Sequence, residues 1–450
     1  MTLARRQMLA SVIAGLTAGS WPRLYAAPLA EHVTLPHPLR RRDGDVDWQA
    51  VRALFPLAPD WVHLASFLLV SHPKPVAEAI DRFRRKLDAD PVWLELAALS
   101  DSEGRPFEAV KRALADYIGG QPSEICITSN TTGALAMAYH GLRIRADQEI
   151  VTTEHDHYSH HESIRYSAAR SGCGVRYIPL YDTGSSANIA QITERVAKAI
   201  TPKTRAVGVT WVHSSTGVKL PIADIATVVA RANAGRSEAD RCLLIVDGVH
   251  GFANQDVDAA RTGCDFFAAG THKWLFGPRG TGFLWGKSDV WQYLRPTIPS
   301  FDPDSFQTSW PAWMNRAPLP PTQASSVSPG GFVAFEHLLA VPAAVDLHRS
   351  IGRDRVAARI ADLNASFRDA AAKLKGLTLH TPRDPELSAG ISCFEVDGLT
   401  VDQVTARLAA KKIRTTTSPY KKSYARVAAG IMNSPDDIDT VLRAIRELGA

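Results

Sequence analysis

Two short stretches decide the fold of this chain: Val246-Asp247-Gly248-Val249-His250, and further along Ala269-Gly270-Thr271-His272-Lys273-Trp274. The first stretch ends an apolar run over 242–246, which is too short for a helix and is typical of a buried strand. Asp247 and His250 are therefore expected at the carboxyl end of a strand, where open α/β sheets bind their ligands.

The spacing of the charged residues in these stretches indicates a particular cofactor. Lys273 follows Asp247 by 26 residues, and an acid, a histidine and a lysine in this order predict a pocket for pyridoxal phosphate (PLP). Lys273 is expected to form the Schiff base, and Asp247 to keep the pyridine nitrogen protonated. His250 would reach the phenolic oxygen or the imine, while Thr271 and His272 would hold the phosphate. The alternatives are a turn cap for Asp247 and a core position for His250.

A second phosphate contact is predicted where a strand over 125–129 meets a helix over 133–142. The connecting residues are Ser129-Asn130-Thr131-Thr132-Gly133, and a helix N-terminus offers free amide groups to an anion. Thr131, Thr132 and Gly133 are the expected cofactor-binding residues, although the same pattern also serves as an ordinary helix cap.

A histidine-rich segment, Glu154-His155-Asp156-His157-Tyr158-Ser159-His160-His161-Glu162, follows a predicted strand over 149–153. His157 is expected to cover the cofactor ring, and Tyr158 is the second candidate and a substrate-binding residue. Because His157 and His161 have helical i, i+4 spacing, a divalent metal site is the rival interpretation. That rival describes a metal-binding protein without a cofactor.

Two further side chains complete the predicted site. Ser214 follows a strand that begins at Ala206 and is placed to bond the cofactor ring oxygen or the substrate. Arg426 lies in Tyr424-Ala425-Arg426-Val427-Ala428, a short strand near the C-terminus. Its guanidinium fork suits the α-carboxylate of an amino acid.

Strands and helices alternate from about residue 125 to 285, which predicts a mostly parallel sheet covered by helices on both faces. The predicted organisation is an N-terminal arm over 27–60, a large cofactor-binding domain over 61–300, a proline-rich loop over 301–330 and a small α+β domain over 331–450. The loop is expected to cover the site or to contact a partner subunit.

The first 26 residues read as an export signal of the twin-arginine (Tat) type. Arg5 and Arg6 precede an apolar run over 9–18, which is too short to span a bilayer, and Leu24-Tyr25-Ala26 resembles a cleavage site. We therefore expect Tat-dependent export to the periplasm and no stable membrane insertion. A net charge of +5, of which the signal contributes three, gives no reason to expect nucleic acid binding. The five cysteines are too few and odd in number for a disulfide framework.

Together these residues resemble the class V aminotransferase family of fold-type I PLP enzymes. The resemblance is carried by Thr131-Thr132-Gly133, the segment 154–157, the segment 214–221, the Asp247 to His250 and Gly270 to Gly280 stretches, and the segment 426–439. It implies a seven-stranded sheet in a large domain, a small C-terminal domain and a homodimer. The isopenicillin N epimerase-like branch is the most similar, since it has histidine where cysteine desulfurases have glutamine at position 250. The epimerase-like branch often has tyrosine at position 157.

The resemblance also bears on the reaction. Desulfurases use a cysteine on a mobile loop, whereas Cys393 lies inside a predicted strand, which argues against desulfuration. Combined with the export signal, the chain resembles the periplasmic PLP enzymes that modify the glutamate of pyoverdine siderophores. We expect action at the free α-amino group and Cα of an amino acid or a peptide-bound glutamate, as a transaminase or a related tailoring enzyme. Epimerisation and C–S lyase activity are the alternatives.

Overall fold

The computed structural model describes residues 39–98 and 105–449. The predicted export signal and the first part of the predicted arm lie outside the described residues. Within the described part of the chain, no helix is long and apolar enough to cross a membrane.

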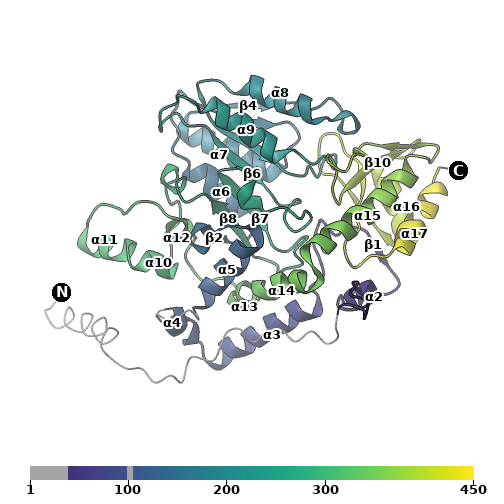
Figure 1. Ribbon diagram of the computed structural model, residues 1–450, viewed down its shortest axis with the longest axis horizontal. Helices are drawn as coiled ribbons and strands as arrows, with labels where there is room; N and C mark the ends of the chain where they lie inside the picture. Colours follow the sequence, from purple (N-terminus) through teal and green to yellow (C-terminus); the bar gives the residue numbers. More distant parts are fainter. Residues whose placement is uncertain (1–38, 99–104, 450) are drawn as a thin grey trace.

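A seven-stranded sheet forms the centre of the larger lobe (Figure 1). Its strand order is β2-β8-β7-β6-β5-β3-β4, and β8 alone among these seven runs antiparallel to its neighbours. The predicted mostly parallel, seven-stranded sheet is therefore confirmed. The strands are β2 (Ile125–Thr128), β3 (Glu149–Thr153), β4 (Gly174–Ile178), β5 (Thr204–Thr210), β6 (Leu243–Asp247), β7 (Phe266–Gly270) and β8 (Gly282–Gly286).

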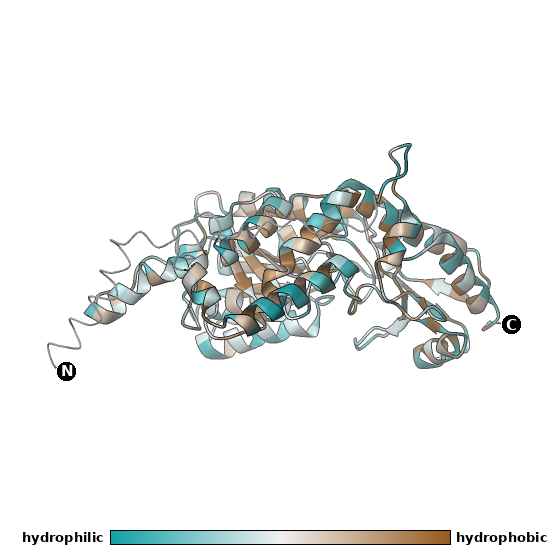
Figure 2. Cartoon of the chain, turned by 90° about the horizontal axis from the view of Figure 1, so that it is seen from below, coloured by the Kyte–Doolittle hydropathy of each residue, from teal (hydrophilic) through white to brown (hydrophobic). Residues whose placement is uncertain are grey.

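Alternate residues of the buried strands point into two separate apolar clusters. Leu244 and Val246 of β6 join one cluster, and Leu243 and Ile245 join the other. Because both faces of the sheet are covered, the strand sequences are continuously apolar instead of alternating. Figure 2 shows the apolar residues gathered on the central strands, with hydrophilic residues on the outer faces of the helices.

Helices pack on both faces of this sheet. On one side lie α6 (Thr131–Gly141) and α7 (Tyr158–Ser171), and on the other α8 (Ile189–Ala199) and α9 (Ile222–Ala232). A further group of helices packs together beneath the sheet (Figure 1). This group comprises α3 (Lys74–Ala89), α4 (Trp93–Ala98), α5 (Pro106–Ile118), α13 (Phe335–Leu339) and α14 (Val341–Ile351). Short 3-10 helices occur at Pro122–Glu124, Gly184–Ser186, Ala259–Arg261 and Trp291–Tyr293.

The smaller lobe is an α+β domain with a four-stranded antiparallel sheet of order β12-β13-β10-β9. Phe367, Phe394 and Val441 belong to its own apolar core. Its elements are α15 (Arg353–Ala371), β9 (Leu377–Leu379), β10 (Ser392–Val396), α16 (Val401–Ala410), β11 (Ile413–Arg414), β12 (Thr416–Thr417), β13 (Ala425–Val427) and α17 (Pro435–Arg446).

Both predicted limits of the large domain need correction. Helices α13 and α14 pack on α3 and α5, and the residues of α14 belong to the large apolar core, so the small domain begins near α15 and not at residue 331. At the other end, β1 (Val62–His63) pairs in parallel with β11, so this segment belongs to the small lobe. Helix α2 (Trp48–Ala53) lies in the predicted arm. Pairings between residues this far apart in the chain leave no local pattern in the sequence.

The predicted proline-rich loop contains three short helices, α10 (Pro303–Phe306), α11 (Ser309–Asn315) and α12 (Ala324–Val327). Proline fits the first turn of a helix, and Pro303 at the start of α10 is such a case. Asp302 caps α10 and lies 2.8 Å from Lys111 of α5, and both side chains are buried. This ion pair fixes the start of the segment against the large domain.

Candidate active site

One pocket gathers most of the predicted site residues at the carboxyl ends of the parallel strands. It is lined by Thr131, Thr132, His157, Ser214, Asp247, His250, His272, Lys273 and Arg426, together with Phe67, Leu68, Leu69 and Arg279. Gly133, Tyr158 and Thr271 were also predicted, and they do not line it. The convergence follows from topology, because the ends of parallel strands meet at one edge of the sheet.

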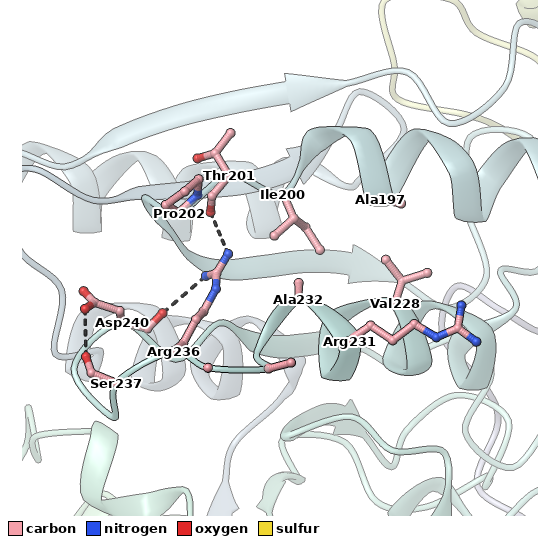
Figure 3. A pocket seen from close by; sticks show the side chains of 12 residues that line it. Ala197, Ile200, Thr201, Pro202, Val228, Arg231, Ala232, Arg236, Ser237 and Asp240 are labelled. Atoms are coloured by element: carbon pink, nitrogen blue, oxygen red, sulfur yellow. Dashed lines mark hydrogen bonds between the residues drawn. The ribbon is translucent and has the colours of Figure 1, made fainter.

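A larger hollow lies at the opposite edge, between the ends of α8 and α9 (Figure 3). Two arginines, Arg231 and Arg236, line it, and Arg236 donates hydrogen bonds to the carbonyls of Thr201 at 2.7 Å, Thr204 at 2.8 Å and Asp240 at 3.3 Å. The guanidinium of Arg236 therefore holds the loop before β6 in place. We regard this hollow as a structural groove.

Asp247 lies at the last position of β6 and is buried. One of its oxygens accepts a 3.0 Å hydrogen bond from the amide of Val249. Burial raises the pKa of Asp247 to about 7, the Val249 bond lowers it, the charge of Asp156 raises it and Lys273 lowers it. A buried carboxylate of this kind is suited to a cationic partner, which a protonated pyridine ring would provide.

Lys273 follows β7 in a short turn and faces the same pocket. Burial lowers the pKa of its amine to about 8, with Asp247 opposing this effect and Arg426 adding to it. A substantial fraction of the amine is therefore neutral near pH 8, as a lysine that attacks a carbonyl requires.

The phosphate end of the pocket contains polar atoms that lack partners. The Thr131 hydroxyl and the His272 Nδ1 atom are buried and form no hydrogen bond within the described part of the chain. Both approach Gly270, where an added Cβ would lie 3.2 Å from the hydroxyl and 3.1 Å from Nδ1. Buried groups of this kind normally have partners, so these two atoms fit a bound phosphate.

Two predicted phosphate ligands have other hydrogen-bond partners and do not line the pocket. The amide of Gly133 donates to the Asn130 side chain at 2.8 Å, which makes Asn130 the cap of α6. The Thr271 hydroxyl bonds Thr281 and the carbonyl of Pro278, and it is buried away from the pocket. The Thr271 hydroxyl thus bonds residues of the turn that follows β7. The sequence pattern does not reveal these hydrogen bonds.

His157 and Tyr158 point in different directions. His157 caps α7 and lines the pocket, with its ring edge-on to Tyr420 at 6.1 Å. Tyr158 is 67% exposed and lies outside the pocket, so within one chain it does not contribute to the site.

The other histidines of this segment have separate partners. His155 stacks on Tyr181 at 3.9 Å, and His161 Nε2 lies 2.7 Å from the carbonyl of Thr153. His157 and His161 therefore do not converge on one point. Within residues 39–98 and 105–449 there is no group of three or more side chains that could hold a metal ion.

His250 and Arg426 both contact Phe67, a residue that was not predicted from the sequence. Phe67 packs edge-on to His250 at 5.8 Å and lies 4.4 Å beneath the Arg426 guanidinium. Burial lowers the pKa of His250 well below its usual value, and the charges of Lys273 and Arg426 add to this effect. His250 is therefore neutral, and its Nδ1 atom has no partner among the described residues.

Arg426 retains free donors although it is buried. Its Nε and two Nη atoms each donate one hydrogen bond, to Thr416, Ser214 and Thr417 at 3.2, 3.0 and 2.7 Å. An arginine carries five N–H groups, so two remain for a carboxylate.

Ser214 also has a partner that the sequence did not suggest. Its hydroxyl lies 2.7 Å from the hydroxyl of Tyr420, in the small domain. Tyr420 stands in a lysine-rich loop without any periodicity, so no local pattern marked it or Phe67 as part of a site.

The fold and the site together define a PLP-dependent enzyme of fold type I. The chain belongs to the aminotransferase class V family, which matches residues 71–440. This establishes the enzyme class and the cofactor. PLP supplies an electron-withdrawing ring that acidifies the bonds at the substrate Cα.

Curated relatives extend over nearly the whole chain. An isopenicillin N epimerase of Streptomyces clavuligerus is 27% identical over 89% of this chain and 98% of its own length. A probable cysteine desulfurase of Halobacterium salinarum is 25% identical over 90% of this chain and 97% of its own.

Solved structures with the same fold include the cystine C-S lyase C-DES in complex with its product cysteine persulfide. It matches with a TM-score of 0.75 and 21% identity, covering 88% of this chain and all of that one. The cysteine desulfurase of Thermococcus onnurineus has a TM-score of 0.73 and 19% identity, covering 89% and 97% of the two chains.

Proposed function

We propose that this protein is a periplasmic PLP enzyme acting at the free α-amino group and Cα of an amino acid or of a peptide-bound glutamate, as a transaminase or a related siderophore-tailoring enzyme. The observation that carries this proposal is the meeting of Lys273, Asp247 and Arg426 in one pocket. A carboxylate bound at Arg426 would place the α-amine and Cα of the same substrate toward Lys273.

Each residue has a defined task in this proposal. Arg426 binds the α-carboxylate with its two remaining N–H groups. Once the substrate amine has displaced Lys273, the free lysine amine would accept the Cα proton and deliver it to another atom. The lowered pKa of Lys273 favours the neutral amine that this transfer requires. Thr131 and His272 would hold the phosphate, His250 and Ser214 would contact the oxygen side of the ring, and His157 would cover the ring face.

The mouth of the pocket favours a substrate larger than a free amino acid. Leu68 and Leu69 line it and are 55% and 56% exposed. An apolar rim of this kind fits the remainder of a peptide whose glutamate enters through its free α-amine and α-carboxylate.

Epimerisation is the second candidate, supported by the relationship to isopenicillin N epimerases. It needs a second proton donor or acceptor on the face opposite Lys273, and His157 is the candidate because Tyr158 lies outside the pocket. A C–S lyase reaction is also consistent with the relatives. Persulfide transfer through Cys393 is disfavoured, because this thiol is buried in β10 and burial raises its pKa to about 12.

We also propose that the active protein is a homodimer exported through the Tat system. Trp313, Leu319 and Phe332 are 74%, 84% and 94% exposed, and exposed apolar side chains of this size favour a protein interface. A second copy of the chain is the partner that the family suggests. The export proposal rests on Arg5, Arg6 and the apolar run that follows them.

The test combines cofactor mapping with substrate turnover. Borohydride treatment of the purified protein should abolish its yellow absorbance and leave a phosphopyridoxyl group on the Lys273 peptide. Lys273→Ala should lose both the label and all activity, whereas Lys203→Ala, which changes an exposed lysine, should retain them. Turnover with a labelled Lys203 and an unlabelled Lys273 would contradict the assignment.

The substrate is tested with γ-glutamyl dipeptides, in which the glutamate keeps its α-amine and α-carboxylate. We expect an oxo product from the glutamate residue, and no reaction with the N-acetylated dipeptide. Exchange of the Cα hydrogen with inversion and without an oxo product would replace the transaminase proposal by the epimerase one.

A further inference from the structure

A buried carboxylate that no part of the proposed reaction uses lies beneath the pocket. Asp156 accepts hydrogen bonds from the Thr152 hydroxyl and the Thr153 amide, both at 2.9 Å, and from the Thr210 amide at 2.8 Å. Its side chain has no exposed surface. Three donors on a carboxylate stabilise its charged form, so Asp156 is a fixed negative charge inside the protein.

Two imidazoles flank this charge. His160 Nδ1 lies 3.9 Å and His213 Nε2 lies 3.7 Å from the same Asp156 oxygen. These separations exceed hydrogen-bond length. Burial alone would raise the pKa of Asp156, but the two imidazoles and the hydrogen bonds lower it well below its usual range.

The outer nitrogen of each imidazole bonds a buried tyrosine. Tyr139 lies 2.6 Å from His160, and Tyr181 lies 2.8 Å from His213. Burial lowers the pKa of His160 to about 4, so this imidazole is neutral and leaves Asp156 without a full counter-charge. Among the described residues, Asp156 has no lysine or arginine in an ion pair.

Asp156 and Asp247 are connected through one backbone position. Thr210, whose amide donates to Asp156, is the register partner of Asp247 across β5 and β6. Thr210 also lines the pocket. The two carboxylates are close enough for the charge of Asp156 to act on Asp247. Asp247 therefore lines the pocket, and a second buried acid, Asp156, lies behind it, on the side where a cationic ring nitrogen would be held.

We infer that Asp156 is a positioning residue for the cofactor, a second buried negative charge that adds to that of Asp247 and so favours the binding of a cofactor whose pyridine nitrogen is protonated and cationic. It does not touch the ring. Its hydrogen bonds to Thr153 and Thr210 also fix the segment that carries His157 against the end of β5, so the charge remains at a constant place. This role depends on the cofactor and not on the proposed substrate.

The test compares two cofactors in the absence of substrate. PLP has a ring nitrogen that can be protonated, and 1-deaza-PLP has a C–H group in its place. Asp156→Asn should weaken the binding of PLP by about tenfold, the order expected for one charge at this range. It should leave the dissociation constant of the deaza analogue nearly unchanged. Thr152→Val, which removes one hydrogen bond to Asp156 and no charge, should change neither constant by more than about twofold.

Equal weakening of both cofactors in Asp156→Asn would show that the residue only shapes the pocket and would overturn the inference. If this variant does not fold, the wild-type holoenzyme decides the question. The ¹⁵N chemical shift of labelled PLP should be that of a protonated pyridine from pH 6 to 9. A ¹⁵N chemical shift typical of a neutral pyridine at pH 7 would overturn the inference, even if the enzyme acts on the proposed substrates. Inactivity toward γ-glutamyl dipeptides would contradict that function and leave this result unaffected.

Discussion

The guanidinium of Arg426, in the small domain, donates a 3.0 Å hydrogen bond to the carbonyl of Ser214, in the large domain. The Ser214 hydroxyl in turn bonds Tyr420 of the small domain at 2.7 Å. The residue proposed to bind the substrate carboxylate thus also joins the two domains at the pocket. Domain orientation and substrate position are therefore coupled at one side chain.

Replacing Arg426 by glutamine should raise the KM for the amino substrate by about ten- to a hundredfold, with a smaller fall in kcat. Glutamine keeps an amide N–H donor, so the net loss is about one charge-assisted hydrogen bond to the carboxylate, which contributes about 1.5–3 kcal/mol. Steady-state kinetics measures this, with Arg414→Gln as the matched control because Arg414 is exposed on β11. An unchanged KM in the Arg426 variant would mean that the carboxylate binds elsewhere.

Capture of PLP by the cofactor-free protein should accelerate as the pH rises through about 8. The pKa of Lys273 is lowered to about 8 by burial, so below this pH the amine is protonated and cannot attack the aldehyde. Stopped-flow absorbance between pH 6.5 and 9.5 measures the rate. A rate that is flat across this interval would contradict the lowered pKa.

Asp247→Asn should make the stability of the cofactor-free protein less dependent on pH. The pKa of Asp247 is raised from 3.8 to about 7 on folding, so its contribution is fully present below pH 4 and is lost as the pH rises through 7. The wild type should lose on the order of 2–4 kcal/mol of stability over this pH range. The asparagine variant should not, because asparagine does not titrate.

Urea unfolding at pH 5 and pH 8 checks this expectation. Relative to the wild type, the variant should have a more favourable free energy of unfolding at pH 8 than at pH 5. With PLP bound, the order should reverse, because asparagine cannot neutralise a cationic ring nitrogen. The same difference between the two proteins at both pH values would show that Asp247 does not titrate in this range.

Gly248→Ala should destabilise the protein by about 1–3 kcal/mol and weaken PLP binding. An added Cβ would lie 1.9 Å from the Phe267 ring, and relieving this overlap must move Asp247, its neighbour. Gly133→Ala is the matched control, since its Cβ would meet nothing closer than 3.6 Å. Alanine favours a helix, so this control should be neutral or slightly stabilising. Thermal unfolding and PLP titration measure both effects.

Substitutions of His157 and Tyr158 should differ in their effects on the cofactor absorbance and on kcat. His157→Gln should shift the absorbance of the bound cofactor and lower kcat, because this side chain lines the pocket. Tyr158→Phe should change neither quantity in assays of turnover and absorbance, since Tyr158 is mostly exposed. An effect of Tyr158→Phe on the cofactor spectrum would indicate that a second subunit brings this residue into a site.

The elements with a strong local pattern were predicted well. The strands predicted over 125–129, 149–153 and 242–246 lie within one residue of β2, β3 and β6 at each end, because buried strands are short continuous apolar runs between polar turns. The helices in 301–330 were missed, since proline at a first helical turn resembles proline in a loop. Among the site residues, Asp247 and Lys273 were found because a strand end fixes where they lie.

The sequence by itself therefore determined the layered fold, the cofactor and the pair of residues at its centre, since these follow from periodicity and from spacing along the chain. Only the tertiary structure decided which neighbours complete the pocket. Phe67 lines the pocket and Tyr420 bonds Ser214, both from distant segments, and Thr271 lies outside the pocket with its hydroxyl bonded to Thr281. Such choices depend on packing and on hydrogen bonds between residues that are far apart in the chain, and a local pattern does not encode them.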